Sequence, residues 1–125
     1  MHDYDISWDY MLDDNVEYKN KKLLNNIIKD IKKTKLSLLK GIKNFSAFCI
    51  ILPNGILGVY CNGTYKKPII GLDIGNIISS CEKYNCNIGL AIKTTILHEL
   101  KHAEQNYLNL KFNENEAEDF AYMNS

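Results

Sequence analysis

The chain has 125 residues, of which 46% are hydrophobic and 24% are charged, and its formal net charge is zero. These values predict one globular domain spanning residues 1–125 and exclude an intrinsically disordered chain. The sequence has no run of eighteen apolar residues, and the opening Met1-His2-Asp3-Tyr4-Asp5 is acidic where a signal peptide is basic. We therefore expect a cytoplasmic protein with no membrane partner.

The N-terminal third of the chain contains an acidic segment followed by a lysine-rich one. Residues 1–17 combine acidic and aromatic side chains, and their weak periodicity leaves open a packed arm or a flexible head. From Lys21 onward, apolar residues recur every three or four positions. This spacing predicts an amphipathic helix that ends at Gly41, a residue suited to a left-handed helix cap.

The outer face of this predicted helix carries Lys22, Lys29, Lys32, Lys33 and Lys40. Clustered positive charge is what phosphate binding requires, so a nucleic acid or an acidic protein is one interpretation of this face. A solvated surface is the favoured interpretation, because the whole chain is neutral and no aromatic side chain lies between the lysines for base stacking.

Three strands are predicted next. Residues 45–52 are almost continuously apolar, which predicts a strand buried on both faces. Asn54-Gly55 separates them from residues 56–61 and predicts a hairpin turn. Residues 68–74 form a third strand, for which the leading Pro68 favours an edge position. The expected fold is therefore α+β with a small, mainly antiparallel sheet.

Helical patterns occupy the rest of the chain. Residues 75–84 predict a short helix with Asn76 as its N-cap. The run from Leu90 to Leu110 contains neither Pro nor Gly and predicts a long helix. Its predicted buried stripe is Leu90, Leu97, Leu100 and Tyr107. A last helix is predicted over residues 114–123, with Ala117, Phe120 and Ala121 as its core contacts.

The four cysteines, Cys49, Cys61, Cys81 and Cys86, contain no C-x-x-C pair, which excludes zinc-ribbon spacing. Cys49 and Cys61 flank the predicted hairpin. They are interpreted either as facing one another or as small apolar core residues, which is the commoner role in intracellular proteins.

The long predicted helix contains His98-Glu99-Leu100-Lys101-His102, an H-E-x-x-H pattern. At 3.6 residues per turn, His98 and His102 project from one face and can bind one metal ion. Glu99 then flanks the metal without joining its ligands, which is the position of a base that deprotonates an attacking water molecule. The alternative is two surface histidines that happen to lie four residues apart.

A catalytic zinc normally has three protein ligands, so a third is expected elsewhere in the chain. His2 is a poor candidate because it belongs to the acidic head, and the acidic helix 114–123 is preferred. Helical geometry leaves the choice among its acids open: Glu114, Glu116 and Glu118 flank the core-facing side, whereas Asp119 points away from it.

The H-E-x-x-H helix resembles the active-site helix of gluzincin-like zincin metallopeptidases. Glu116-Ala117-Glu118-Asp119-Phe120-Ala121 is similar to the E-A-x-x-F-A element of small ImmA/IrrE-type members. The resemblance implies a minimal zincin domain with Zn2+ as cofactor, Glu116 as third ligand and Glu99 as general base. It also implies that the strand before the metal helix binds an extended peptide, with Gly71 permitting close backbone approach.

The predicted function is therefore zinc-dependent hydrolysis of peptide bonds in a protein substrate. The main alternative is a non-catalytic, zinc-stabilised module that binds protein or nucleic acid. A DNA-associated protease of SprT type shares the motif and would need the lysine face to bind nucleic acid. A fourth protein ligand would favour the module, whereas an open water position would favour the enzyme.

Overall fold

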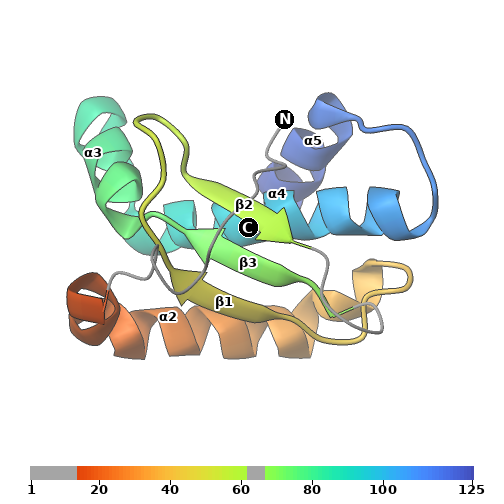
Figure 1. The fold of residues 1–125 in the computed structure, drawn as a ribbon, viewed down its shortest axis with the longest axis horizontal. Coiled ribbons are helices and arrows are strands. Elements are labelled where there is room, and N and C mark those ends of the chain that lie inside the picture. Colours follow the sequence, from red (N-terminus) through yellow and green to blue (C-terminus); the bar gives the residue numbers. More distant parts are fainter. Residues whose placement is uncertain (1–13, 62–66) are drawn as a thin grey trace.

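The structure, a computed structural model, describes residues 14–61 and 67–125. These residues form four α-helices and a three-stranded sheet, which confirms the α+β class (Figure 1). The elements are α2 (Asp14–Thr34), the 3-10 helix η1 (Leu36–Leu38), β1 (Ser46–Cys49), β2 (Gly58–Cys61), β3 (Ile69–Leu72), α3 (Ile74–Tyr84), α4 (Ile88–Tyr107) and α5 (Glu114–Asn124). None of these described helices is long and apolar enough to cross a membrane.

Helix α2 begins and ends earlier than the apolar pattern indicates. It starts at Asp14, inside the predicted acidic head, whose residues 1–13 lie outside the described part of the chain. It ends at Thr34 rather than Gly41, because the chain then tightens into η1, where the Leu39 N–H donates to the Leu36 carbonyl (3.1 Å). Gly41 does adopt the expected left-handed conformation (φ 80°). The outer lysines of α2 are exposed.

The sheet has the order β1-β3-β2, with β1 parallel and β2 antiparallel to β3. It is therefore mixed rather than mainly antiparallel. The predicted turn forms, since Gly55 has φ 85° and the Ile56 N–H donates to the Pro53 carbonyl (3.1 Å). The predicted hairpin is wrong, however, because β3 lies between the two strands that flank this turn (Figure 1).

Strand β3 is central, so its predicted edge position is also wrong. Pro68 is tolerated because it precedes the first ladder residue, Ile69, and its carbonyl still accepts from the Ser46 N–H (3.2 Å). Strand β1 is an edge strand that is buried on one face rather than both: Ser46 and Phe48 are exposed, whereas Cys49 is fully buried. Gly71 has a strand on either side and is closed to a further backbone.

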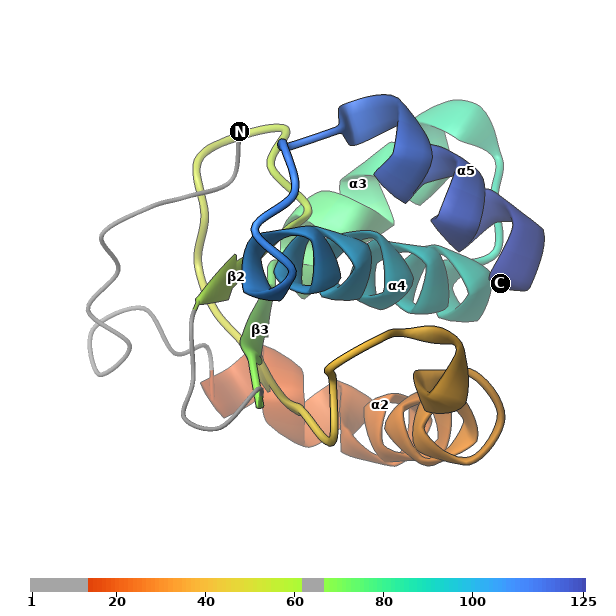
Figure 2. The ribbon, with the colours of Figure 1, turned by 90° about the vertical axis from the view of Figure 1, so that its right-hand side faces the viewer.

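Helices α2 and α4 lie on the same side of the sheet, as the edge-on view of Figure 2 shows. The main core between these layers is aliphatic, and it includes Leu24, Ile27 and Ile31 of α2, Ile70 and Leu72 of β3, and Ile92, Ile96 and Leu100 of α4. Helix α4 also contacts α3 and α5. The buried surface of α4 is therefore wider than one stripe of residues. Leu90, predicted to be buried, is 49% exposed in the first turn of this helix.

The N-cap of α3 is Asp73 rather than the predicted Asn76. Asp73 Oδ1 accepts from the Asn76 N–H (2.9 Å), and its Oδ2 accepts from the Leu52 N–H (2.8 Å). The Asn76 side-chain amide instead donates to the carbonyls of Pro53 and Ile56, both at 2.9 Å. These contacts hold the segment before β2 against the start of α3.

No disulfide joins the cysteines, all four of which belong to the part of the chain that the structure describes. Cys49 lies opposite Leu72 and Cys61 opposite Ile69, so the two cysteines sit on different strands at opposite ends of β3. Cys49 packs in the main core as a small apolar residue.

Gly58 is the point of closest approach between β2 and α4. A Cβ built there would lie 2.6 Å from Thr95 Cγ2 and 3.2 Å from the Gly71 carbonyl oxygen. Since the first of these distances is shorter than any van der Waals contact, a larger residue would push β2 away from α4. The same Cβ would approach Glu99 Cγ at 3.6 Å, so the spacing of β2 affects the motif directly.

We therefore expect Gly58→Ala to destabilise the protein by about 1–3 kcal/mol, the usual cost of overpacking. Urea denaturation measures the change. Gly75→Ala is the matched control, because Gly75 is exposed at the start of α3. Equal stability of the two variants would contradict a close β2–α4 contact.

Candidate metal centre

Two capped helices present the candidate ligands. Asn87 caps α4 through its side-chain oxygen, which accepts from the Leu90 N–H (2.9 Å), and Asn113 caps α5 in the same way toward the Glu116 N–H (3.0 Å). Helix α5 packs against α4 through the fully buried Ala117 and Ala121. Two small residues on this face let the helix axes come close, so the first turn of α5 reaches the middle of α4.

His98, His102 and Glu114 meet at this crossing. Their three candidate ligand atoms, the two Nε2 nitrogens and one Glu114 carboxylate oxygen, lie within 4.8 Å of one another. The two Nε2 atoms are 3.2 Å apart, and Glu114 Oε1 is 3.3 Å from His102 Nε2. Glu114 Oε1 is also in direct contact with His98 Nε2. A single ion can therefore reach all three residues.

Two of the three separations between these atoms are those expected around a zinc ion. Bonds of 2.0–2.1 Å at tetrahedral angles place neighbouring ligand atoms about 3.3 Å apart. The His98–His102 and His102–Glu114 separations match this value, whereas His98 Nε2 and Glu114 Oε1 lie closer together and would have to move apart around an ion. Two imidazoles and a carboxylate are also a usual protein ligand set for catalytic zinc.

The protonation of His98 suits a metal ligand. Burial lowers the pKa of His98, although the negative charges of Glu114 and Glu118 act in the opposite direction. A lowered pKa keeps the imidazole neutral at physiological pH, and a neutral ring has a nitrogen lone pair to offer.

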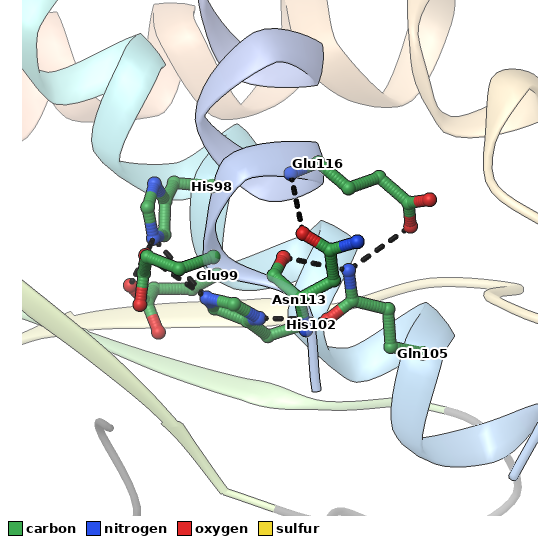
Figure 3. Close-up of polar contacts among 7 residues, drawn as sticks. His98, Glu99, His102, Gln105, Asn113 and Glu116 are labelled. Carbon is green, nitrogen blue, oxygen red and sulfur yellow. Dashed lines mark hydrogen bonds and ion pairs between the residues drawn. The ribbon is translucent and has the colours of Figure 1, made fainter. Parts of the chain in front are cut away.

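Gln105 determines which nitrogen of His102 carries the proton. The backbone of Asn113 orients the Gln105 amide, since the Asn113 carbonyl accepts from Gln105 Nε2 (3.0 Å) and the Asn113 N–H donates to Gln105 Oε1 (3.3 Å). Gln105 Oε1, 2.9 Å from His102 Nδ1, must then accept a hydrogen bond from that nitrogen, which therefore carries the proton. His102 Nε2 is left with its lone pair directed at His98 (Figure 3). Glu114 Oε1 lies 3.3 Å from the same nitrogen.

Phe112 packs against one face of the same imidazole. Its ring stacks on His102 with the centroids 4.1 Å apart and the planes 9° from parallel. The stack and the Gln105 contact together restrict rotation of the His102 ring. Neither residue was identified from the sequence. The available signal for Gln105 was its position three residues after His102, on the same helical face.

Glu116, the third ligand implied by the family resemblance, lies outside this group. Its Oε1 accepts from Gln105 Nε2 (3.0 Å), and its side chain points toward Gln105 rather than the histidines (Figure 3). The structure instead brings together His98, His102 and Glu114, and Glu114 is one of the three acids that helical geometry had left open. His2 lies outside the described residues.

Glu99 is buried beside the candidate ligands. It is 2% exposed, and its Oε2 lies 4.0 Å from His98 Nε2. No described residue forms a hydrogen bond with its Oε1. Burial raises the pKa of Glu99 to about 9, and the negative charge of Glu114 adds to this effect. A buried carboxyl oxygen without a partner is unfavourable, which indicates that this position suits a ligand or a bound ion.

A cleft of about 760 Å³ opens over these residues. Segments from β2, the end of α3, α4 and α5 line it, and they include Gly58, Leu90, His98, Glu99 and Glu114. His98 and Glu114 are therefore accessible to a ligand of substantial size, and the Glu99 carboxyl group forms part of the same wall. His102 is buried behind them and does not line the cleft.

Replacement of Gln105 tests whether its hydrogen bond to His102 Nδ1 supports metal binding by that histidine. Gln105→Met keeps the volume and removes the hydrogen bond, so we expect zinc affinity to fall about 10–100-fold, the usual effect of removing such a partner. Competition with a chelating dye measures the affinity. Asn115→Ala, an exposed change on α5, is the control and should have no effect. Unchanged affinity in Gln105→Met would contradict this role.

Glu99 should make the stability of the metal-free protein depend on pH. Below pH 4.5 the Glu99 carboxyl group is protonated in both the folded and the unfolded protein. Between pH 4.5 and about 9 it ionises in the unfolded chain but stays protonated in the folded one. Stability is therefore lost as pH rises through this window. Glu99→Gln should stabilise the chelator-treated protein more at pH 8 than at pH 5, by on the order of 1 kcal/mol or more. An equal effect of Glu99→Gln at both pH values would contradict a raised pKa for Glu99.

Comparisons of the chain with models of known protein families, with curated proteins and with solved structures found no match. The similarity to zincins therefore rests on the short motifs at residues 98–102 and 116–121. A function for this site has to be inferred from the geometry of its own residues.

Proposed function

We propose that this protein is a zinc-dependent metallopeptidase of zincin type, with His98, His102 and Glu114 as its metal ligands. One observation carries the proposal. Three candidate ligand atoms gather where α4 and α5 meet, His98 and Glu114 among them border a cleft, and the buried carboxyl group of Glu99, whose Oε1 has no hydrogen-bond partner among the described residues, lies beside them. The substrate class is a protein or peptide.

Zinc bound at this site would supply Lewis-acid chemistry, which acidifies water and polarises a carbonyl group. Glu99 acts as the general base, accepting a proton from the attacking water and passing it to the leaving amine. A zinc ion bound beside Glu99 would lower its raised pKa and favour the ionised form, which is the form that a base requires. Gln105 and Phe112 would keep the His102 ring oriented with its Nε2 lone pair available to the metal.

The number of ligands supports the enzyme over its main rival. Structural zinc sites are closed by four protein ligands, whereas catalytic sites keep one position open for water or substrate. The group found among the described residues has three members, and its surroundings open into the cleft.

A non-catalytic, zinc-stabilised module is the second candidate, because the ligands come from two different helices. His98 and His102 belong to α4 and Glu114 to α5, so a metal would clamp the two helices together whether or not it catalysed a reaction. Metal binding and catalysis therefore need separate tests.

The first test assigns the ligands. We expect about one zinc per chain in the wild-type protein, and we expect Glu114→Ala or His102→Ala to lose it, because a ligand atom is removed. Glu116→Ala should retain zinc with a smaller loss of affinity, since it removes only a partner of Gln105. Elemental analysis after dialysis decides between them. Full zinc in Glu114→Ala together with loss in Glu116→Ala would reverse the assignment.

The second test separates the enzyme from the module. Glu99→Gln should keep zinc and the fold while losing peptide hydrolysis by a factor of 100 or more, roughly the contribution of a general base. Cleavage of a peptide library and zinc content are measured on the same preparation, because loss of activity alone does not distinguish a missing base from a missing metal. Wild-type cleavage by Glu99→Gln would exclude the proposed mechanism.

A further inference from the structure

The cleft is lined by more carboxylates than the proposed chemistry uses. Four acidic residues line it, of which Glu114 is assigned to the metal and Glu99 to proton transfer. The other two, Glu118 and Asp119, are exposed neighbours on α5 and have no part in that chemistry. Glu118 is one helical turn beyond Glu114, and its charge acts on His98.

No lysine is found among the described residues that line this cleft, although the chain has fifteen basic residues. Lysines elsewhere in the structure do pair with acids: Lys93 with Asp30 at 2.8 Å, and Lys101 with Glu104 at 2.6 Å. The cleft is therefore negative, through Glu114, Glu118 and Asp119, in a protein that is neutral overall.

The walls between these carboxylates are apolar. Leu57 lies on the β2 side, Leu90 and Ala91 belong to the first turn of α4, and Ala121 and Tyr122 follow on α5. Leu90 is 49% exposed and Tyr122 is 83% exposed, so both offer apolar surface to a ligand. A long aliphatic stem with a cationic end has this distribution of polarity, and such stems pack along apolar surface while the charged end stays near water.

We propose that the cleft selects a lysine or arginine side chain of the substrate, with its stem against Leu90 and Ala91 and its cationic end beside Glu118 and Asp119. The inference rests on the proposed function, since it names the substrate class of the same site. The unpartnered Glu99 Oε1, in the wall of the same cleft, independently marks the cleft as a ligand site.

The strength of the selection follows from the exposure of the two acids. Both are solvated, so each contributes the modest attraction of a surface ion pair rather than that of a buried one. Two such contacts amount to a preference on the order of tenfold for lysine over an uncharged side chain of equal length. The preference should weaken as salt concentration rises, because exposed charges are screened.

Binding to the inactive, zinc-loaded Glu99→Gln protein tests the inference without turnover. The probes are fluorescent peptides of one sequence that carry lysine, norleucine or glutamate at each position in turn, with binding followed by anisotropy. Norleucine matches the lysine stem and lacks its charge. We expect one position at which lysine binds on the order of tenfold more tightly than norleucine, with glutamate weakest.

Charge removal then identifies the residues responsible. In the Glu99→Gln background, Glu118→Gln combined with Asp119→Asn should reduce the lysine preference to near one while retaining zinc. Glu82→Gln, an exposed acid on α3 outside the cleft, is the matched control and should leave the preference unchanged. Equal binding of lysine and norleucine at every position, or a preference that survives the double substitution, would overturn the inference.

The same peptides distinguish this inference from the proposed function when zinc-loaded wild-type protein is used. Cleavage without a lysine preference rejects the basic-side-chain pocket and leaves the peptidase. Selective binding of lysine peptides that the wild-type protein does not cleave rejects the peptidase and leaves a module that binds basic peptides.

Discussion

The burial of α4 is the constraint on which the rest of the structure depends. This helix contacts α2, α3, α5 and the sheet, yet its buried positions include Glu99, His102, Glu104 and Gln105. A buried polar group is costly unless it has a partner. Glu104 has partners in the Lys40 N–H and the Lys101 ammonium, and Gln105 uses both ends of its amide. Glu99 Oε1 is the exception, and it is the one that borders the cleft.

The contact between Gln105 and Asn113 links two properties of the site. Asn113 is the N-cap of α5, and its backbone orients the Gln105 amide that sets the tautomer of His102. Glu114 is the next residue, so the same contact locates the carboxylate beside the two histidines. The tautomer of His102 and the position of Glu114 are therefore determined together when α5 docks on α4.

The distribution of charge separates two surfaces of a neutral chain. Lysines occupy the exposed face of α2, whereas the carboxylates gather around the cleft between α4 and α5. A negative cleft attracts cations, both a metal ion at the histidines and a basic side chain at its rim. The proposed metal ligation and the proposed substrate preference thus depend on one electrostatic feature.

Local interactions explain what the sequence by itself determined: the helices, the turn at Gly55 and the shared face of His98 and His102, since four residues on a helix always bring two side chains together. Tertiary structure decided the strand order, because insertion of β3 between β1 and β2 is a long-range pairing that the Asn54-Gly55 signal does not encode. It also decided among Glu114, Glu116 and Glu118, which local helical geometry treats alike. Helix α5 docks on α4 through Ala117 and through the Gln105–Asn113 contact. This docking places Glu114 at the histidines and directs Glu116 to Gln105. Both placements depend on where α5 lies against α4, which the sequence of α5 alone does not determine.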